Sequence, residues 1–168
     1  MKSLLTCLLI GCLVIPVWGQ ERNLTFEEFM QKLENNQAWT QENTEALLSV
    51  KLTKASSEVY KALGRFVYGK GLIVNDISYY VRVETNEMRG LHIWLDDKSS
   101  CFTQERIKKL YPGGEADGSY VRPGGAGDIY RINRGWGWLT FLFGDQKQWE
   151  CLTGITIGIN RVIYIEDP

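Results

Sequence analysis

The chain has 168 residues, and its 19 lysines and arginines against 20 aspartates and glutamates give a formal net charge of −1. A nucleic-acid-binding protein needs a basic excess on one face, so this balance disfavours that class of function. The sequence also lacks a cationic amphipathic segment of the kind that binds membrane surfaces.

The first nineteen residues, MKSLLTCLLIGCLVIPVWG, have the pattern of a cleaved secretory signal. Lys2 provides the positive start, an apolar run follows, and Val17 and Gly19 occupy the −3 and −1 positions of a small-residue cleavage site. The run is shorter than the roughly 20 residues that span a bilayer. We therefore predict a signal peptide over 1–19, a single mature domain over 20–168 with no transmembrane segment, and a periplasmic or secreted location.

A second interpretation of the same segment stays open. Cys12 follows Leu9-Ile10-Gly11, as in a lipoprotein signal, and the protein would then be lipid-anchored at Cys12. In either case Cys101 and Cys151 remain as the mature thiols, and two cysteines in an exported chain predict one disulfide. With His92 as the single histidine, soft ligands are too few for a zinc site, and we expect no metal or cofactor.

Helices are expected at the start of the mature chain. Thr25 and Glu28 form a capping-box pattern. Apolar residues then follow at the spacing of one helix face: Phe26, Phe29, Met30 and Leu33. Thr40 is a second plausible N-cap, so we predict a helical hairpin over residues 26–50.

From about residue 59 the pattern changes to that of strands. Apolar runs at 66–68 and 72–74 flank a glycine-rich turn, and further strands are expected at 78–83 and 91–95. Thr103 can cap a short helix over 104–110. Residues 112–127 contain six glycines and predict a long loop, after which strands resume at 129–132, 138–143 and 153–164. The predicted fold class is α+β: an N-terminal helical hairpin and a short central helix packed on an antiparallel β-sheet, with one disulfide.

The candidate binding residues lie in the stretch RINRGWGWLTFLF, residues 131–143. On a strand, the side chains of 139, 141 and 143 point to one face and those of 136 and 138 to the other. The two tryptophans either cover the second face of the sheet or form an exposed patch, the arrangement in which Trp and Arg dominate binding. The candidate binding residues are Trp136, Trp138, Arg134, Arg131, Asp128, Gly124 and Gly125.

Catalytic motifs are sparse. Neither a Gly-x-Ser-x-Gly nor a His-Glu-x-x-His pattern occurs. On a strand His92 would share a face with Trp94, and we expect it to be a packed or half-exposed residue and not a catalytic one. We therefore expect a non-enzymatic, exported protein-binding domain, in its sharpest form an immunity or inhibitor protein that blocks an envelope-targeting toxin or cell-wall hydrolase. The alternatives are an outer-membrane or envelope assembly accessory protein, possibly a lipoprotein, and a secreted carboxylate-dependent hydrolase.

Overall fold

The computed structural model describes residues 23–36, 38–69, 71–85, 87–96, 101–122, 125–144 and 151–159. The signal segment 1–19, with Cys12, lies outside these residues, as does Gly124. The described chain forms the following elements, in order: α1 (Phe26–Glu34), α2 (Gln41–Leu48), β1 (Thr53–Lys54), β2 (Val59–Gly69), β3 (Leu72–Val81), β4 (Met88–Leu95), α3 (Gln104–Leu110), β5 (Glu115–Arg122), β6 (Gly125–Arg134), β7 (Gly137–Phe143) and β8 (Leu152–Gly158).

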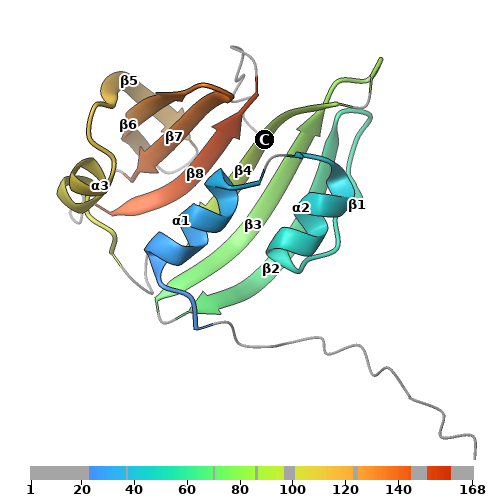
Figure 1. The fold of residues 1–168 in the computed structure, drawn as a ribbon, viewed down its shortest axis with the longest axis horizontal. Coiled ribbons are helices and arrows are strands. Elements are labelled where there is room, and N and C mark those ends of the chain that lie inside the picture. The colour runs from blue at the N-terminus through green and yellow to red at the C-terminus, as the bar shows by residue number, and fades with distance from the viewer. Residues whose placement is uncertain are drawn as a thin grey trace, which may run out of the picture.

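All eight strands belong to one antiparallel sheet with the order β1-β2-β3-β4-β8-β7-β6-β5 (Figure 1). Each half of the sheet is a run of consecutive strands, β1 to β4 and β5 to β8, in which sequence neighbours pair. The halves meet where β4 pairs with β8. The last of the described strands, β8, therefore lies at the centre of the sheet.

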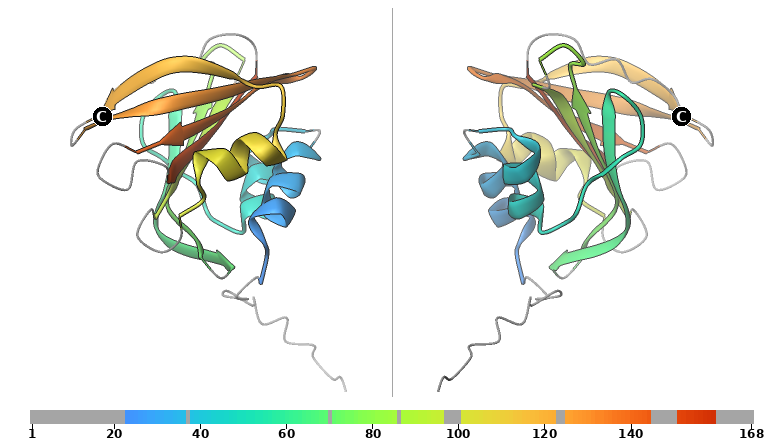
Figure 2. Two further views of the ribbon diagram at one scale, coloured as in Figure 1. Left: turned by 90° about the vertical axis from the view of Figure 1, so that its left-hand side faces the viewer. Right: turned by 90° about the vertical axis from the view of Figure 1, so that its right-hand side faces the viewer.

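The three helices lie on the same face of this sheet (Figure 2). Between them and the strands is a large apolar core, to which β4, β7 and β8 contribute alternate residues such as Ile93, Phe141 and Ile155, all fully buried. The predicted core positions Leu139, Phe141 and Phe143 are confirmed as core residues. We refer to the opposite side of the sheet as the helix-free face, since no described helix lies on it.

The helix starts form as the sequence predicts. The Thr25 hydroxyl accepts a hydrogen bond from the Glu28 amide at 3.1 Å, and the Glu28 carboxylate accepts one from the Thr25 amide at 2.7 Å, so the capping box is complete. Thr40 caps α2 and Thr103 caps α3. The structure confirms helices within 26–50 as two separate elements, α1 and α2, whereas their pairing as a hairpin stays a prediction.

The predicted loop over 112–127 is wrong. Residues 115–122 form β5, and β6 already begins at Gly125, so the segment is mostly a β-hairpin. The pairing is interrupted between Ala116 and Ser119, where Gly118 adopts a φ of +83°. Glycine takes this conformation without the steric cost of a Cβ, and the extra residue makes a β-bulge. The glycines therefore shape a strand instead of preventing one.

Two other strand predictions change in extent. The runs at 72–74 and 78–83 belong to one strand, β3, whose register shifts between Val74 and Asp76. Strand β8 covers 152–158, and the part of the predicted strand from residue 160 onward lies outside the described residues.

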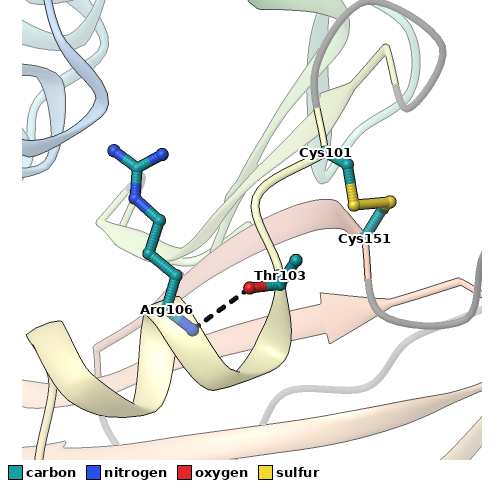
Figure 3. Close-up of a disulfide and its surroundings, with 4 residues drawn as sticks. All are labelled: Cys101, Thr103, Arg106 and Cys151. Atoms are coloured by element: carbon teal, nitrogen blue, oxygen red, sulfur yellow. Dashed lines mark hydrogen bonds between the residues drawn. A yellow bond between two sulfur atoms is a disulfide. The ribbon is translucent and has the colours of Figure 1, made fainter.

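The predicted disulfide between Cys101 and Cys151 is confirmed (Figure 3). It connects the segment just before α3 to the residue just before β8. Nearby, the Thr103 hydroxyl accepts the hydrogen bond from the Arg106 amide that begins α3, at 3.2 Å. The bond thus fixes the start of α3 beside the start of the central strand β8.

Helix α1 contacts both halves of the sheet. Its Phe29 ring packs on Tyr68 of β2, with 5.0 Å between centroids. On the other side, Glu27 forms a 2.7 Å ion pair with Arg106 of α3, and Glu34 forms a 3.1 Å ion pair with Arg134 of β6. The first helix therefore joins the two halves on the helix side, opposite the β4–β8 pairing.

Candidate functional site

A row of polar side chains crosses the helix-free face, one from each of five neighbouring strands of the eight. Cross-strand register places these residues in line from β3 to β6: Ser78, His92, Thr156, Thr140 and Arg131. The four residues from Ser78 to Thr140 are each at most 5% exposed. We call this set the polar row. Its central members are interior groups, and only the Arg131 end reaches solvent, with a side chain 31% exposed.

His92 is packed, and it shares its face of β4 with Trp94. The two rings lie 4.2 Å apart between centroids, and the imidazole Nδ1 is 3.1 Å from the Thr156 hydroxyl oxygen. Gly154 makes room for them, because a Cβ there would lie 3.2 Å from both rings. Burial lowers the pKa of His92 to about 4, so the imidazole is neutral at pH 7.

Three polar atoms of the row have no hydrogen-bond partner among the described residues: His92 Nε2, Thr140 Oγ1 and Arg131 Nε. Unpaired buried polar groups are uncommon in folded proteins and each costs free energy. Three of them on a single row mark this line as a polar seam inside the helix-free face.

The exposed end of the row is an arginine–aromatic cluster. The Arg131 guanidinium lies over the Trp138 ring, 5.5 Å from its centroid, and forms a 2.6 Å ion pair with Asp117 of β5. The Asp117 side chain is 41% exposed, so this pair is accessible from outside. Stacking on an indole holds a guanidinium in one orientation, which suits it for contacts with another molecule.

Trp136 lies in the turn that connects β6 to β7. Arg134 pairs with Gly137, so only Gly135 and Trp136 form the connection. Gly137 has a φ of +153°, and a Cβ on it would come into contact with the Gly158 backbone oxygen. The start of β7, directly after the turn, therefore lies tightly against the end of β8. Trp136 is 36% exposed, while the space around Gly135 holds no described heavy atom within 4 Å of its Cβ position.

The remaining predicted residues are elsewhere. Arg134 points to the helix face, where it pairs with Glu34 and lies 5.7 Å from the Tyr111 ring centroid, so its position is a structural one. Asp128 is exposed but lies five residues, about 16 Å, along β6 from the residue that pairs with Trp138. Gly125 is at the far end of the same strand, and Gly124 is outside the described residues. The structure thus brings together Trp138 and Arg131, with Trp136 at the adjoining turn.

Sequence reasoning missed Asp117 and Thr140. Asp117 fell in the segment predicted as a loop, which hid its pairing with Arg131 across β5 and β6. Thr140 could have been found, because the alternation along β7 places it on the face of Trp138. Among the described residues, no group of three or more potential ligand side chains gathers in a way that could hold a metal ion.

No helix within the described part of the chain has the length and apolar character needed to cross a membrane. Comparisons of the chain with protein-family models, with curated proteins and with solved structures found no match. The functional argument therefore starts from the geometry of the residues themselves.

Proposed function

We propose that the chain is an exported protein-binding domain that acts as an immunity or inhibitor protein, blocking an envelope-targeting toxin or a cell-wall hydrolase by occupying its active site. The observation that supports the proposal is the β6–β7 tip, defined here as Trp136, Trp138, Arg131 and Asp117. It combines an exposed tryptophan with a pre-oriented arginine, the two residue types most enriched among binding hot spots.

The tip is suited to this role because its backbone is held rigidly. Gly137, directly after the two-residue turn, lies against the backbone of Gly158, and Arg134 holds the end of β6 to Glu34 of α1 from the opposite face. A side chain presented on a rigid element loses little conformational freedom on binding, so more of its contact energy contributes to affinity. Trp136 would insert into a partner pocket, and Arg131 and Asp117 would supply the polar rim around it.

The two edge strands of the sheet are less suitable binding sites for a partner than the tip. Strand β1 has only two residues, and the outer strand β5 carries the bulge at Gly118. Short edge strands and bulges are the devices by which sheets avoid adding a further strand. A partner would therefore contact the side chains of the tip in preference to extending the sheet through backbone hydrogen bonds.

The test is affinity capture of proteins from the native cell envelope with the full mature chain as bait. Two variants serve as matched bait, Trp136→Ala and Leu63→Ala, because Leu63 is an exposed apolar residue on β2, 72% accessible and remote from the tip. We expect wild type and Leu63→Ala to retain a secreted enzyme, and Trp136→Ala to retain at least about 30-fold less of it, as for a hot-spot residue. The melting temperature should be the same for all three proteins.

The purified chain should then inhibit the captured enzyme, and Trp136→Ala should not. Capture that does not depend on Trp136, or a captured enzyme that keeps full activity when saturated with the chain, would contradict the proposal. Hydrolysis of peptidoglycan or glycosides by the purified chain alone would instead support the alternative of a secreted hydrolase. Mass analysis of the native protein tests the export step, for which cleavage before Gln20 predicts a mature start at that residue.

A further inference from the structure

The pairing of β4 with β8 is the point at which the two halves of the sheet meet, and His92 lies at its middle. On either side of the His92–Thr156 pair along the helix-free face are the pairs Gly90–Gly158 and Trp94–Gly154. The junction therefore presents three glycines and a threonine beside one titratable side chain. Any change in the charge of that side chain acts directly on the central pairing of the sheet.

Neutral and protonated imidazole differ in what they require at this position. In the neutral form one ring nitrogen can share a hydrogen bond with the Thr156 hydroxyl, over the 3.1 Å observed. In the protonated form both nitrogens are donors, and Nε2 has no acceptor among the described residues. A buried positive charge without an acceptor or counter-ion is strongly unfavourable.

The charged groups that face His92 do not supply that counter-ion. On β3 the nearest carboxylate is Asp76, two residues from Ser78, the direct partner of His92. Burial raises the pKa of Asp76, and the Asp76 carboxylate accepts a 3.4 Å hydrogen bond from Ser78, whereas the described contacts of the imidazole are to Thr156 and Trp94. Lys61 lies one strand further on β2, and Arg131 is three strands away on β6, about 14 Å. The described residues of β7 and β8 are all uncharged.

We propose that His92 makes the β4–β8 junction an acid-labile joint, so that protonation of this one imidazole opens the pairing between the two halves before either half loses its own strand pairings. The neighbouring pairings support the order of events. Strands β2 to β4 pair among themselves, as do β5 to β8, and the Cys101–Cys151 bond fixes the start of β8 beside the segment that leads into α3.

The direction of the effect follows from linkage. The folded-state pKa of about 4 is below the ordinary value of 6.5 that His92 regains when the joint opens. The open form therefore binds the proton more strongly, and the closed joint loses stability as the pH falls from 6.5 towards 4. Between pH 7 and pH 4.5 these two values give a rise of about 50-fold in the opening equilibrium constant.

Amide hydrogen exchange of the full chain, with its disulfide intact, measures this opening strand by strand. Between pH 7 and pH 4.5, after correction for the intrinsic exchange rate, we expect protection of residues 90–94 and 154–158 to fall about 50-fold. Protection in the β2–β3 and β6–β7 pairings should fall less than about fivefold. In His92→Gln, and in His92→Phe if the glutamine variant does not fold, protection at the junction should change less than about threefold. Glu42→Gln, which removes an exposed carboxylate on α2, should respond as wild type does.

Nuclear magnetic resonance gives a second readout, because the chain contains only one histidine and hence one imidazole signal. In the native protein this signal should titrate well below pH 6. The proposal is overturned if the signal titrates near pH 6.5 with the fold intact, if the His92 variants keep the wild-type pH response, or if all strands lose protection together.

Discussion

The two halves of the sheet have the same strand arrangement but are stabilised differently. The first half packs under α1 and α2, with a continuous apolar core from Leu33 and Leu48 to Ile77 and Ile93. The second half has a single helix of its own, the seven-residue α3, of which Ile107 is the buried residue. In place of helical cover it has the Cys101–Cys151 bond and two arginines that pair with carboxylates of α1.

This difference indicates how a half with little helical cover can still be rigid enough for the binding role that we propose for it. The apolar side of β7 is as well buried as that of β4, so the strands themselves are secure. The second half lacks a large helix that would hold its outer strands. The disulfide and the ion pairs with α1 hold this half instead. The β6–β7 tip belongs to this half. Changes that weaken these contacts should therefore affect the second half more than the first.

Loss of the disulfide should have the largest effect. The bond closes a loop with a sequence separation of 50 residues, and the chain-entropy model gives about 4 kcal/mol for such a loop. We expect the Cys101→Ser/Cys151→Ser protein to lose about this much free energy of unfolding in denaturant titrations at pH 7. In hydrogen exchange α3 and β8 should lose protection before β2 and β3 do. Equal losses in the two halves would show that they are not stabilised differently.

Removal of the ion pair between β6 and α1 should have an intermediate effect. Arg134 and Glu34 have side chains 36% and 26% exposed, so solvent screening limits their pair to about 0.5–1 kcal/mol. Arg134→Gln should lower the free energy of unfolding by this amount, and a double-mutant cycle with Glu34→Gln should recover it as a coupling energy. The matched variant Arg131→Gln, which changes a pair within the second half, should reduce partner binding more than stability. The reverse result would place the binding role on Arg134.

The smallest effect is expected from the pair between α1 and α3, and it depends on pH. The hydrogen bond from Arg106 is the largest cause that lowers the pKa of Glu27 below its ordinary 4.5. Because the folded-state pKa is the lower one, the stabilisation is complete above about pH 4.5 and is lost as the pH falls through the folded value. Urea titrations should show Arg106→Gln less stable than wild type by a few tenths of a kcal/mol at pH 7. That gap should narrow as the pH falls below 4.5, and a constant gap would exclude the ion pair as its cause.

The sequence predicted those elements that carry local signals. Thr25, Thr40 and Thr103 each cap a helix, and the helix starts were correct because capping is a matter of three or four neighbouring residues. Strand β5 was missed because its residues 115–119 are solvent-exposed or nearly so on both faces. A strand without a buried face has no period-two hydrophobic pattern. Only its backbone pairing with β6 defines it.

Prediction of the candidate site from the sequence was limited for a different reason. Arg131 and Arg134 are three residues apart, and in a strand an odd separation places side chains on opposite faces. The sequence therefore contained the information that only one of them could accompany Trp138. The pairing of Arg131 with Asp117 and of Arg134 with Glu34 did not follow from the sequence, because each depends on contacts between elements distant along the chain.

The central position of β8 has a consequence for synthesis on the ribosome. When β4 has emerged, its partner on one side is still missing, and it stays so until the chain has been extended to residue 158. During that interval β4 is a temporary edge strand with unpaired backbone groups, and it carries the apolar residues Leu91 and Ile93. A segment of this kind associates readily with other nascent chains. Completion of the described sheet depends on β8, so a chain that stops before this strand should need a chaperone to stay in solution.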